Sequence, residues 1–265
     1  MLGRQTLNLS AKRMAHILQV EFGNGISSDE IAKLHAERFA DGLFHHLGAE
    51  AVLSIDADDY QDASQLHDLN QPVPAEMRQR FSCVLDGGTL EHVFNIVEAF
   101  RSAMDMVAVG GSFLAVAPIN NYLGHGFHQL GHEFFFRALS PEYGFEMVNF
   151  SLVDGRDTAT WYEMSDPKDL GRRAEITTDR PTLAMVHARR TAIKPILETM
   201  PQQSDYITTW SKNSAHRPKR PSRVTRAFER RVMGIPALKL SARYDPAALK
   251  AFEPAERYRS NEAGT

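Results

Sequence analysis

The chain of 265 residues contains one cysteine and no long uninterrupted apolar run. The lone Cys83 excludes an intrachain disulfide framework and suits a reducing environment. The longest nearly apolar stretch, residues 107–119, includes two glycines, a serine and a proline, and it is shorter than the ~20 residues that span a bilayer. The start, MLGRQTLNLSAKR, lacks the apolar region of a signal peptide. These absences predict a cytoplasmic protein without a transmembrane segment.

Hydrophobic residues make up 43% of the chain, which is enough for a full α/β core. The formal net charge of −3 conceals a basic segment, Lys212 to Arg231, in which eight basic residues accompany a single acid, Glu229. Such a cluster could contact an anionic partner, namely a nucleotide-linked substrate, an anionic membrane or nucleic acid. A solvated tail is favoured, because no nucleic-acid motif accompanies the charges. We therefore expect an α/β domain over residues 1–200 and a basic extension over 201–265.

The first half of the chain contains patterns typical of a helix followed by a strand. Ser27 and Glu30 form a capping box ahead of an apolar helical face, and Gly48 supplies the stop. The apolar positions of this expected helix are Ile31, Leu34, Phe39, Leu43 and Leu47. Residues 51–55 follow as a buried strand that ends in the acidic run Asp56 to Asp59. An acid at the end of a parallel strand lies at the sheet edge where open α/β folds bind ligands.

The segment 81–146 predicts a strand, a helix, a double-glycine stop and a second strand. Residues 83–85 form a short apolar run, and the expected strand position makes Cys83 a buried, unreactive thiol. A helical face follows, and residues 112–117, 145–153 and 182–188 are three further expected strands. The residues on the buried helix face are Val93, Ile96, Val97, Phe100, Met104 and Val107.

This order of elements resembles the second half of a class I S-adenosylmethionine-dependent methyltransferase. The resemblance is carried by Gly88-Thr89-Leu90-Glu91-His92-Val93, by Gly110-Gly111, and by Asn120-Asn121 with Gly124-His125-Gly126-Phe127. It covers about residues 51–189. It implies an α/β, Rossmann-like sheet of seven strands, mostly parallel, with helices on both faces. In that family the seventh strand lies antiparallel between the fifth and the sixth.

The resemblance implies that S-adenosylmethionine is the cofactor and that an acid holds its ribose hydroxyls. Asp56 is the expected acid and Asp58 the reserve, since a carboxylate can accept two hydrogen bonds at once. Asp68 and Leu69 match the positions near the adenine amino group and the adenine ring. Without a ligand, both acidic stretches would be ordinary turns.

The N-terminus departs from the family pattern. The family opens with an apolar strand and a GxGxG turn near the methionine part of the cofactor, whereas here MLGRQ precedes the first polar stretch. Gly3 would be the surviving glycine, the central strand would be a stub, and Asp86 and Gly88 would complete the cofactor site. Ser82 also stands where the family usually has Asp. Either the chain as given begins downstream of its natural start, or the motif is lost, which would favour a non-catalytic methyltransferase-like binding or scaffold protein.

Methyl transfer is an in-line displacement, so the protein must align donor and acceptor and remove a proton from a hydroxyl acceptor. His125 and His128 are the candidate general bases, because they lie in a glycine-rich loop and imidazole exchanges protons near neutral pH. Glu91 and His92, at the expected start of the helix, favour capping or packing roles. The expected acceptor is a small molecule or a sugar-type hydroxyl, by analogy.

Two other classes of function remain open at the level of sequence. The pattern His125, His128 and His132 could bind zinc, but the surrounding glycines break a regular helix and no cysteine lies nearby, so no metal is expected. A nicotinamide-dependent oxidoreductase would need a glycine-rich first turn and a suitably placed Tyr-xxx-Lys pair, and the sequence has neither.

Overall fold

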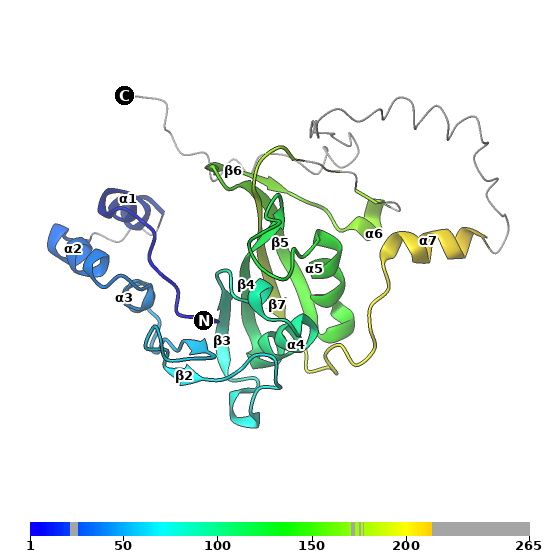
Figure 1. The fold of residues 1–265 in the computed structure, drawn as a ribbon, viewed down its shortest axis with the longest axis horizontal. Coiled ribbons are helices and arrows are strands. Elements are labelled where there is room, and N and C mark those ends of the chain that lie inside the picture. The colour runs from blue at the N-terminus through cyan, green and yellow to red at the C-terminus, as the bar shows by residue number, and fades with distance from the viewer. Residues whose placement is uncertain (22–25, 171–172, 175, 177, 214–265) are drawn as a thin grey trace. The chain divides into compact units, whose positions relative to one another are not determined.

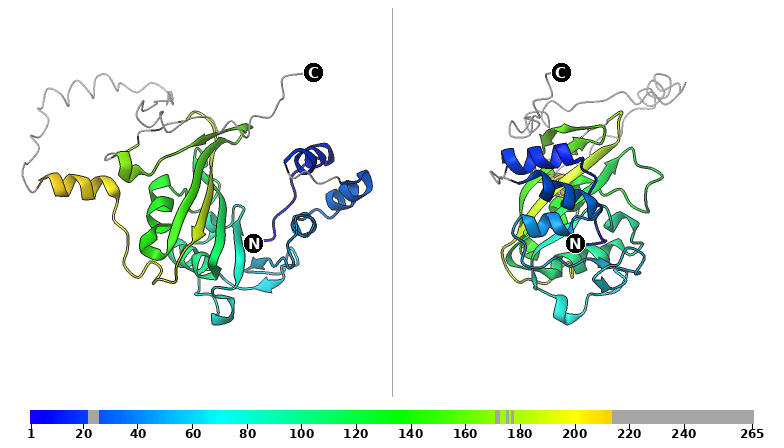
Figure 2. Two further views of the ribbon diagram at one scale, coloured as in Figure 1. Left: turned by 180° about the vertical axis from the view of Figure 1, so that it is seen from behind. Right: turned by 90° about the vertical axis from the view of Figure 1, so that its left-hand side faces the viewer.

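The computed structural model describes residues 1–213 except 22–25, 171, 172, 175 and 177. Most of the basic segment therefore lies outside the described residues, and the expected boundary at residue 200 stays a prediction. The chain divides into two compact units, Met1–Ala115 and Val116–Thr265 (Figures 1 and 2). Within the described residues, no helix combines the length and the apolar character that crossing a bilayer requires.

The first unit begins with two helices that lie side by side, α1 (Ala11–Glu21) and α2 (Ser28–Ala36) (Figure 1). Met14 and Leu18 of α1 pack against Ile31 and Leu34 of α2 in a buried cluster. The predicted capping box is confirmed: the Glu30 amide donates to Ser27 Oγ (3.2 Å) and the Ser27 amide donates to Glu30 Oε2 (3.0 Å).

The single helix expected up to Leu47 is wrong, because α2 ends at Ala36 and a separate α3 spans Asp41–His46. Between them Arg38 has a left-handed backbone (φ 65°), and Phe39 forms an antiparallel bridge with Thr6. Pairing with the N-terminal segment thus overrides the helical pattern. Gly48 ends α3 as expected, with φ of 96° and its amide donating to His45 O (3.0 Å).

Leu2 occupies the predicted stub of a central strand. It forms parallel bridges with Ile55 of β1 (Ile55–Asp56) on one side and with Asp86 of β3 (Phe81–Asp86) on the other. Its amide donates to Leu85 O at 2.8 Å. β1 pairs in parallel with β2 (Gln65–Leu66). The strand expected over residues 51–55 is shorter than predicted, because its ladder toward the stub begins where Met1 O accepts from the Ile55 amide (3.0 Å).

The segment from β3 to β4 keeps the predicted order but changes its boundaries. After β3 come a 3-10 turn, η2 (Leu90–His92), then α4 (Ile96–Met106) and β4 (Val107–Asn120). The apolar face of α4 is confirmed, since Phe100 and Met104 are buried and the Phe100 ring meets Phe113 of β4 edge-on at 5.4 Å. The helix begins later than expected because η2 intervenes.

The double glycine does not stop the helix but lies inside β4. A Cβ at Gly111 would be 2.8 Å from Ser82 O, so β4 and β3 approach too closely there for a side chain. Gly110 has φ of 84°, and the β3–β4 register shifts between Phe81 and Cys83. Cys83 itself is exposed, so its expected burial is wrong; partial desolvation still raises the pKa of its thiol, which disfavours the reactive thiolate.

The second unit contains an antiparallel sheet with α5 (His132–Ala138) packed on β5 (Phe145–Asp154). The Phe135 and Phe136 rings of α5 lie 5.7 Å and 5.4 Å from the Phe150 ring. β5 pairs antiparallel with β6 (Asp157–Glu163) and with β7 (Thr182–Arg190), as the view from behind in Figure 2 shows. The remaining elements are η1 (Ala75–Met77) in the first unit and η3 (Pro141–Tyr143), α6 (Pro167–Leu170) and α7 (Ser204–Asn213) in the second.

The strands form a five-stranded sheet of order β3-β4-β7-β5-β6 and a separate two-stranded sheet, β1-β2. The α/β class is confirmed, and β7 lies between β4 and β5 as expected for the family's seventh strand. The described residues do not form one continuous seven-stranded sheet, because a single residue, Leu2, bridges the two sheets. β6 was not predicted as a strand; it extends the edge as a hairpin partner of β5.

Candidate functional site

Four chain segments of the first unit end at the same sheet edge. Leu2 is in parallel register with Ile55 and with Asp86, so Gly3 follows beside Asp56 and Gly87. The Gly3 amide donates to Ile55 O at 2.8 Å, which fixes this register. On the far side of Asp56, the His67 amide donates to Asp56 O at 2.8 Å. The structure thus brings Gly3, Asp56 and the turn after β3 together, at the edge where open α/β sheets bind ligands.

Gly3 is required by its surroundings. Its φ is 61°, and a Cβ there would be 2.6 Å from Thr89 Oγ1. The preceding carbonyl, Leu2 O, accepts hydrogen bonds from Thr89 Oγ1 (2.9 Å) and Gln5 Nε2 (2.7 Å). Two side chains from different segments therefore hold the end of the stub in place.

The Gln5 side chain also lies against Gly87, in the turn after β3. A Cβ at Gly87 would be 2.2 Å from Gln5 Oε1. The Gln5 side chain thus occupies the space beside Gly87 and lies close to Gly3. Sequence reasoning missed this residue, and a glutamine in a short polar stretch gives no signal that could have identified it.

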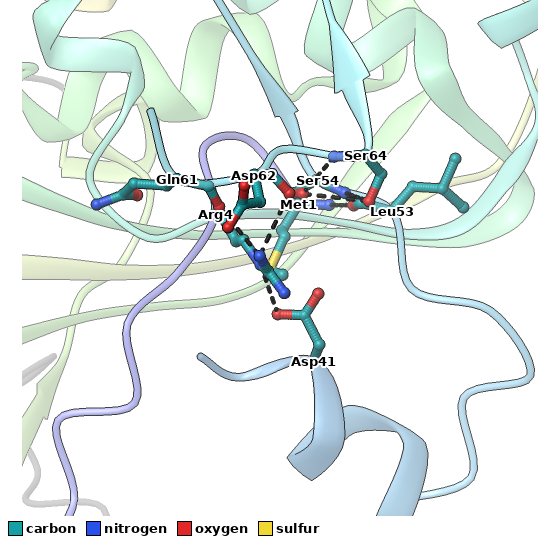
Figure 3. A network of polar contacts seen from close by, with 8 residues as sticks. All are labelled: Met1, Arg4, Asp41, Leu53, Ser54, Gln61, Asp62 and Ser64. Atoms are coloured by element: carbon teal, nitrogen blue, oxygen red, sulfur yellow. Dashed lines mark hydrogen bonds and ion pairs between the residues drawn. The ribbon is translucent and has the colours of Figure 1, made fainter. Parts of the chain in front are cut away.

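Arg4 ties the loop after β1 to the N-terminal segment (Figure 3). Its Nη1 donates to Gln61 O (3.0 Å) and Asp62 O (3.3 Å), and its Nε lies 3.4 Å from Asp41 Oδ2. The guanidinium also lies over the Phe39 ring, 4.2 Å from its centroid. A planar guanidinium suits this role, because it can donate in several directions and stack at the same time. The acidic loop that starts at Asp56 is consequently anchored at its far end.

A second set of contacts in Figure 3 holds the start of β1. The Met1 nitrogen donates to Leu53 O at 2.6 Å. The Ser64 amide donates to Ser54 Oγ (3.0 Å), and the Ser54 amide donates to Ser64 Oγ (3.3 Å). Ser54 is fully buried, so this reciprocal pair satisfies polar groups that would otherwise be costly to bury.

Asp56 is half-buried at the end of β1 and Asp58 is exposed in the loop. Asp56 Oδ1 accepts from the Ala57 amide (2.8 Å), and Asp58 Oδ1 accepts from the Tyr60 amide (3.0 Å). Among the described residues, no donor bonds Asp56 Oδ2. Asp56 therefore presents a carboxylate oxygen at the sheet edge, while Asp58 points into its own turn.

Asp68 and Leu69, the residues expected near the adenine, differ in exposure. Asp68 is exposed, and hydrogen bonds from the Asn70 amide (2.9 Å) and Asn70 Nδ2 (2.8 Å) lower its pKa. Leu69 is buried, with 5% of its surface exposed. Asn70 in turn accepts from the Asn95 amide (2.9 Å) ahead of α4. The ordinary turn geometry is present, and the assignment to adenine stays a prediction.

Asp86 is a buried carboxyl group, with 1% of its surface exposed. Its Oδ1 accepts from the Thr89 amide (2.8 Å) and the Leu90 amide (3.3 Å), so it shapes the turn after β3. Burial raises its pKa to about 7, against the lowering effect of the backbone hydrogen bonds. Gly88, in the same turn, has φ of 105°, which favours glycine. The assignments of Asp86 and Gly88 to the cofactor stay predictions.

The pair Glu91 and His92 lies in η2 and does not open α4, which begins at Ile96. Glu91 is buried while His92 is exposed, and His92 Nε2 is 3.9 Å from Glu91 Oε1. The burial of Glu91 is consistent with the packing role favoured by the sequence.

In the second unit, His125 and His128 lie in the loop between β4 and α5. His125 is exposed, with its ring 5.4 Å from the Tyr122 ring, and His128 is half-buried beside Phe127 at 6.4 Å. His132 begins α5, and burial lowers its pKa. Within the described part of the chain, these three histidines do not form a group whose ligand atoms converge on one point.

Asn120 and Asn121, which contribute to the sequence resemblance, make hydrogen bonds that hold the end of β4. Asn121 Nδ2 donates to Thr178 O (2.8 Å) and Arg180 O (2.8 Å), and Asn120 Nδ2 donates to Thr178 Oγ1 (2.9 Å). Asn121 also has a left-handed backbone (φ 60°), which asparagine tolerates better than most residues. The pair ties the end of β4 to the segment before β7.

Comparisons with known proteins concern the fold. No protein-family model matches the sequence, and no curated protein matches it. Similar solved structures include one from Bacillus halodurans C-125 described as a candidate methyltransferase, with a TM-score of 0.41 and 17% identity over 58% of this chain and 87% of that chain. Another is an S-adenosylmethionine-dependent methyltransferase from Mesorhizobium loti, with a TM-score of 0.36 and 18% identity over 55% of this chain and 83% of that chain.

Proposed function

We propose that this chain is an S-adenosylmethionine-dependent methyltransferase that acts on a small-molecule or sugar-type hydroxyl. The observation that supports it most is the sheet edge of the first unit. There Gly3, Asp56 and the turn after β3 follow three adjacent parallel segments linked by the bridges of Leu2. The position of β7 between β4 and β5 adds the strand order that the family resemblance implies.

The residues at this edge fit the ribose end of the cofactor. Asp56 Oδ1 is held by the Ala57 amide, which orients the carboxylate, and Oδ2 is available to accept from a ribose hydroxyl. Asp68 offers a hydrogen-bond acceptor for the adenine amino group. The expected contact of Leu69 with the adenine ring requires that its side chain, of which 5% is exposed, be uncovered when the cofactor binds. The cofactor would supply a methyl group activated by a sulfonium; the residues of the chain bind and orient it.

We assign His125 as the general base that removes the proton of the acceptor, and His128 as a residue that shapes the same loop. A hydroxyl acceptor loses its proton as the oxygen–methyl bond forms, and a neutral imidazole can take that proton. The loop is exposed over most of residues 121–131, which is compatible with access for a substrate.

A second candidate function is a non-catalytic methyltransferase-like binding protein. The position of Gln5 favours it, because its side chain lies against Gly87 and beside Gly3, near which the methionine part of the cofactor is expected. An active enzyme would have to move Gln5 aside on binding the cofactor, whereas a binding or scaffold protein would keep it in place.

Calorimetric titration of the full chain with S-adenosylmethionine and S-adenosylhomocysteine tests the proposal. Hydrogen bonds to a charged acceptor are worth about 1.5 to 3 kcal/mol, so Asp56→Ala should weaken binding at least about tenfold. Asp58→Ala is the matched control, since it removes a nearby exposed acid of equal charge, and it should change binding less than about threefold. No binding to the wild-type chain at about millimolar ligand would reject the enzyme in favour of the second candidate.

A further inference from the structure

The residues of the candidate cofactor site follow the order of the chain segments along the sheet edge. Asp68 comes after β2, and Asp56 ends β1. Gly3 follows the stub residue Leu2, and Gly87 follows β3. Parallel pairing joins these segments in that order, so each step along the edge is one strand spacing of about 4.8 Å. An adenosine with its adenine at Asp68 and its ribose at Asp56 would therefore direct its 5′ substituent toward Gly3 and Gly87.

The side chain of Gln5 lies where this 5′ substituent would go. Its Nε2 donates to Leu2 O at 2.7 Å and is 3.5 Å from the position that a Cβ on Gly3 would take. Its Oε1 is 2.2 Å from the corresponding position on Gly87. One amide group thus lies against both glycines of the edge. Adenosine ends at its 5′ oxygen, whereas S-adenosylhomocysteine adds a thioether and a charged amino-acid end, so Gln5 obstructs the longer ligand.

The backbone at Gln5 is fixed, so the side chain is the part that has to move. The Ala40 amide donates to Gln5 O at 2.9 Å, and the next residue, Thr6, forms an antiparallel bridge with Phe39. On the other side, the Arg4 guanidinium is anchored to the loop after β1 (Figure 3). The Gln5 side chain is half-buried, so it borders the solvent and can rotate outward without repacking the core.

Moving the Gln5 side chain breaks one hydrogen bond but leaves Leu2 O paired. Thr89 Oγ1 also donates to this carbonyl oxygen, at 2.9 Å, so the acceptor stays satisfied when Gln5 Nε2 leaves. The net contribution of a neutral hydrogen bond corresponds to a factor of about two to about ten in an equilibrium constant. A ligand with an amino-acid end has to overcome this factor, and adenosine does not.

We propose, building on the function proposed above, that Gln5 is a specificity-determining residue of the cofactor site. In its observed position it closes the amino-acid end of the site, which then takes adenosine compounds that lack an amino-acid part. Binding of S-adenosylmethionine or S-adenosylhomocysteine requires Gln5 to rotate away from Gly3 and Gly87. Gln5 therefore lowers the affinity for ligands with the amino-acid end and leaves the affinity for the nucleoside unchanged.

Calorimetric titration of the full chain with adenosine and with S-adenosylhomocysteine tests this role. S-adenosylhomocysteine lacks the sulfonium charge, so the two ligands differ mainly in the amino-acid part. Gln5→Ala should raise the affinity for S-adenosylhomocysteine at least about threefold and change the affinity for adenosine less than about twofold. Thr89→Val should lower the affinity for S-adenosylhomocysteine at least about threefold, because Gln5 is then the remaining side-chain donor to Leu2 O among the described residues and its departure leaves that oxygen unpaired.

Gln19→Ala is the matched control, because Gln19 is an exposed residue of α1 and the chemical change is the same. It should change either affinity less than about twofold. Unchanged melting temperatures exclude misfolding of the variants. Equal gains for both ligands in Gln5→Ala, or a gain below about threefold for S-adenosylhomocysteine, would overturn the role of Gln5 and leave the cofactor site in place. If neither ligand bound the wild type or Gln5→Ala, the proposed function and the role of Gln5 would both be rejected.

Discussion

The buried carboxyl of Asp86 should make the protein less stable as the pH rises from about 4 to about 7. Its pKa is raised from 3.8 to about 7 by burial, so the folded state binds this proton more tightly than the unfolded state. Stability is unaffected well below pH 3.8, declines between about 4 and about 7, and carries the full penalty above about pH 7. At 1.36 kcal/mol per unit of pKa, the shift from 3.8 to about 7 corresponds to a loss of about 4 kcal/mol in the free energy of unfolding.

Asp86→Asn removes the ionisation while keeping the local geometry. The side-chain oxygen of asparagine can still accept from the Thr89 amide (2.8 Å) and the Leu90 amide (3.3 Å). We therefore expect the variant to be more stable than the wild type by up to about 4 kcal/mol at about pH 8 and to differ by less than about 1 kcal/mol at about pH 4.

Urea unfolding followed by far-ultraviolet circular dichroism at several pH values measures this difference. Hydrogen exchange of the peptide that contains Thr89 and Leu90 adds a local measurement, which matters if the two units unfold separately. Asp62→Asn is the control, because it removes an exposed acid at a left-handed position (φ 53°) that asparagine tolerates. An Asp86→Asn effect that is the same at both pH values, or a variant less stable at about pH 8, would refute the reasoning.

Two further predictions concern the candidate site. Gly3→Ala should destabilise the first unit by about 1 to 3 kcal/mol, because the added Cβ would meet Thr89 Oγ1 at 2.6 Å and the backbone φ is 61°. The measurement is thermal melting, with Gly48→Ala as the control. Gly48 has φ of 96° but open space around it, so the comparison separates the steric clash from the backbone strain. His125→Ala should lower the methyl-transfer rate about 100-fold or more with little change in melting temperature, because the side chain is exposed; a drop in stability with an unchanged rate would reverse the assignment.

Local sequence patterns were sufficient to predict several features of the structure. The capping box at Ser27 and Glu30, the stop at Gly48 and the buried face around Phe100 depend on neighbours a few residues apart, and the structure contains all three. The break at Arg38 could not be predicted in this way, because it results from pairing with Thr6, more than thirty residues earlier in the chain.

The candidate site shows the same division between local and long-range effects. The position of Asp56 at the end of a strand could be predicted, because an acid directly after an apolar strand is a local pattern, and its role toward the cofactor stays a prediction. The role of Asp86 inside its own turn was missed, because the pattern gives its position at the strand end but not its burial. Cys83 was expected inside and is exposed, since alternation along one strand does not show which neighbours cover it.

At the sheet edge of the first unit, the carbonyl group of Leu2 accepts hydrogen bonds from two side chains. Leu2 O would be an unsatisfied acceptor at the end of a two-residue stub, but Thr89 Oγ1 and Gln5 Nε2 both donate to it. Thr89 belongs to the turn that Asp86 shapes, so this bond couples the stub to the buried carboxyl. Gln5 is the second support, and it is also the side chain that lies against Gly87. Because Thr89 can hold Leu2 O without it, Gln5 can leave the edge at the cost of one hydrogen bond, about 0.5 to 1.5 kcal/mol. That cost is small against the affinity of a typical cofactor, so the position of Gln5 is compatible with an enzyme whose site opens when the cofactor binds.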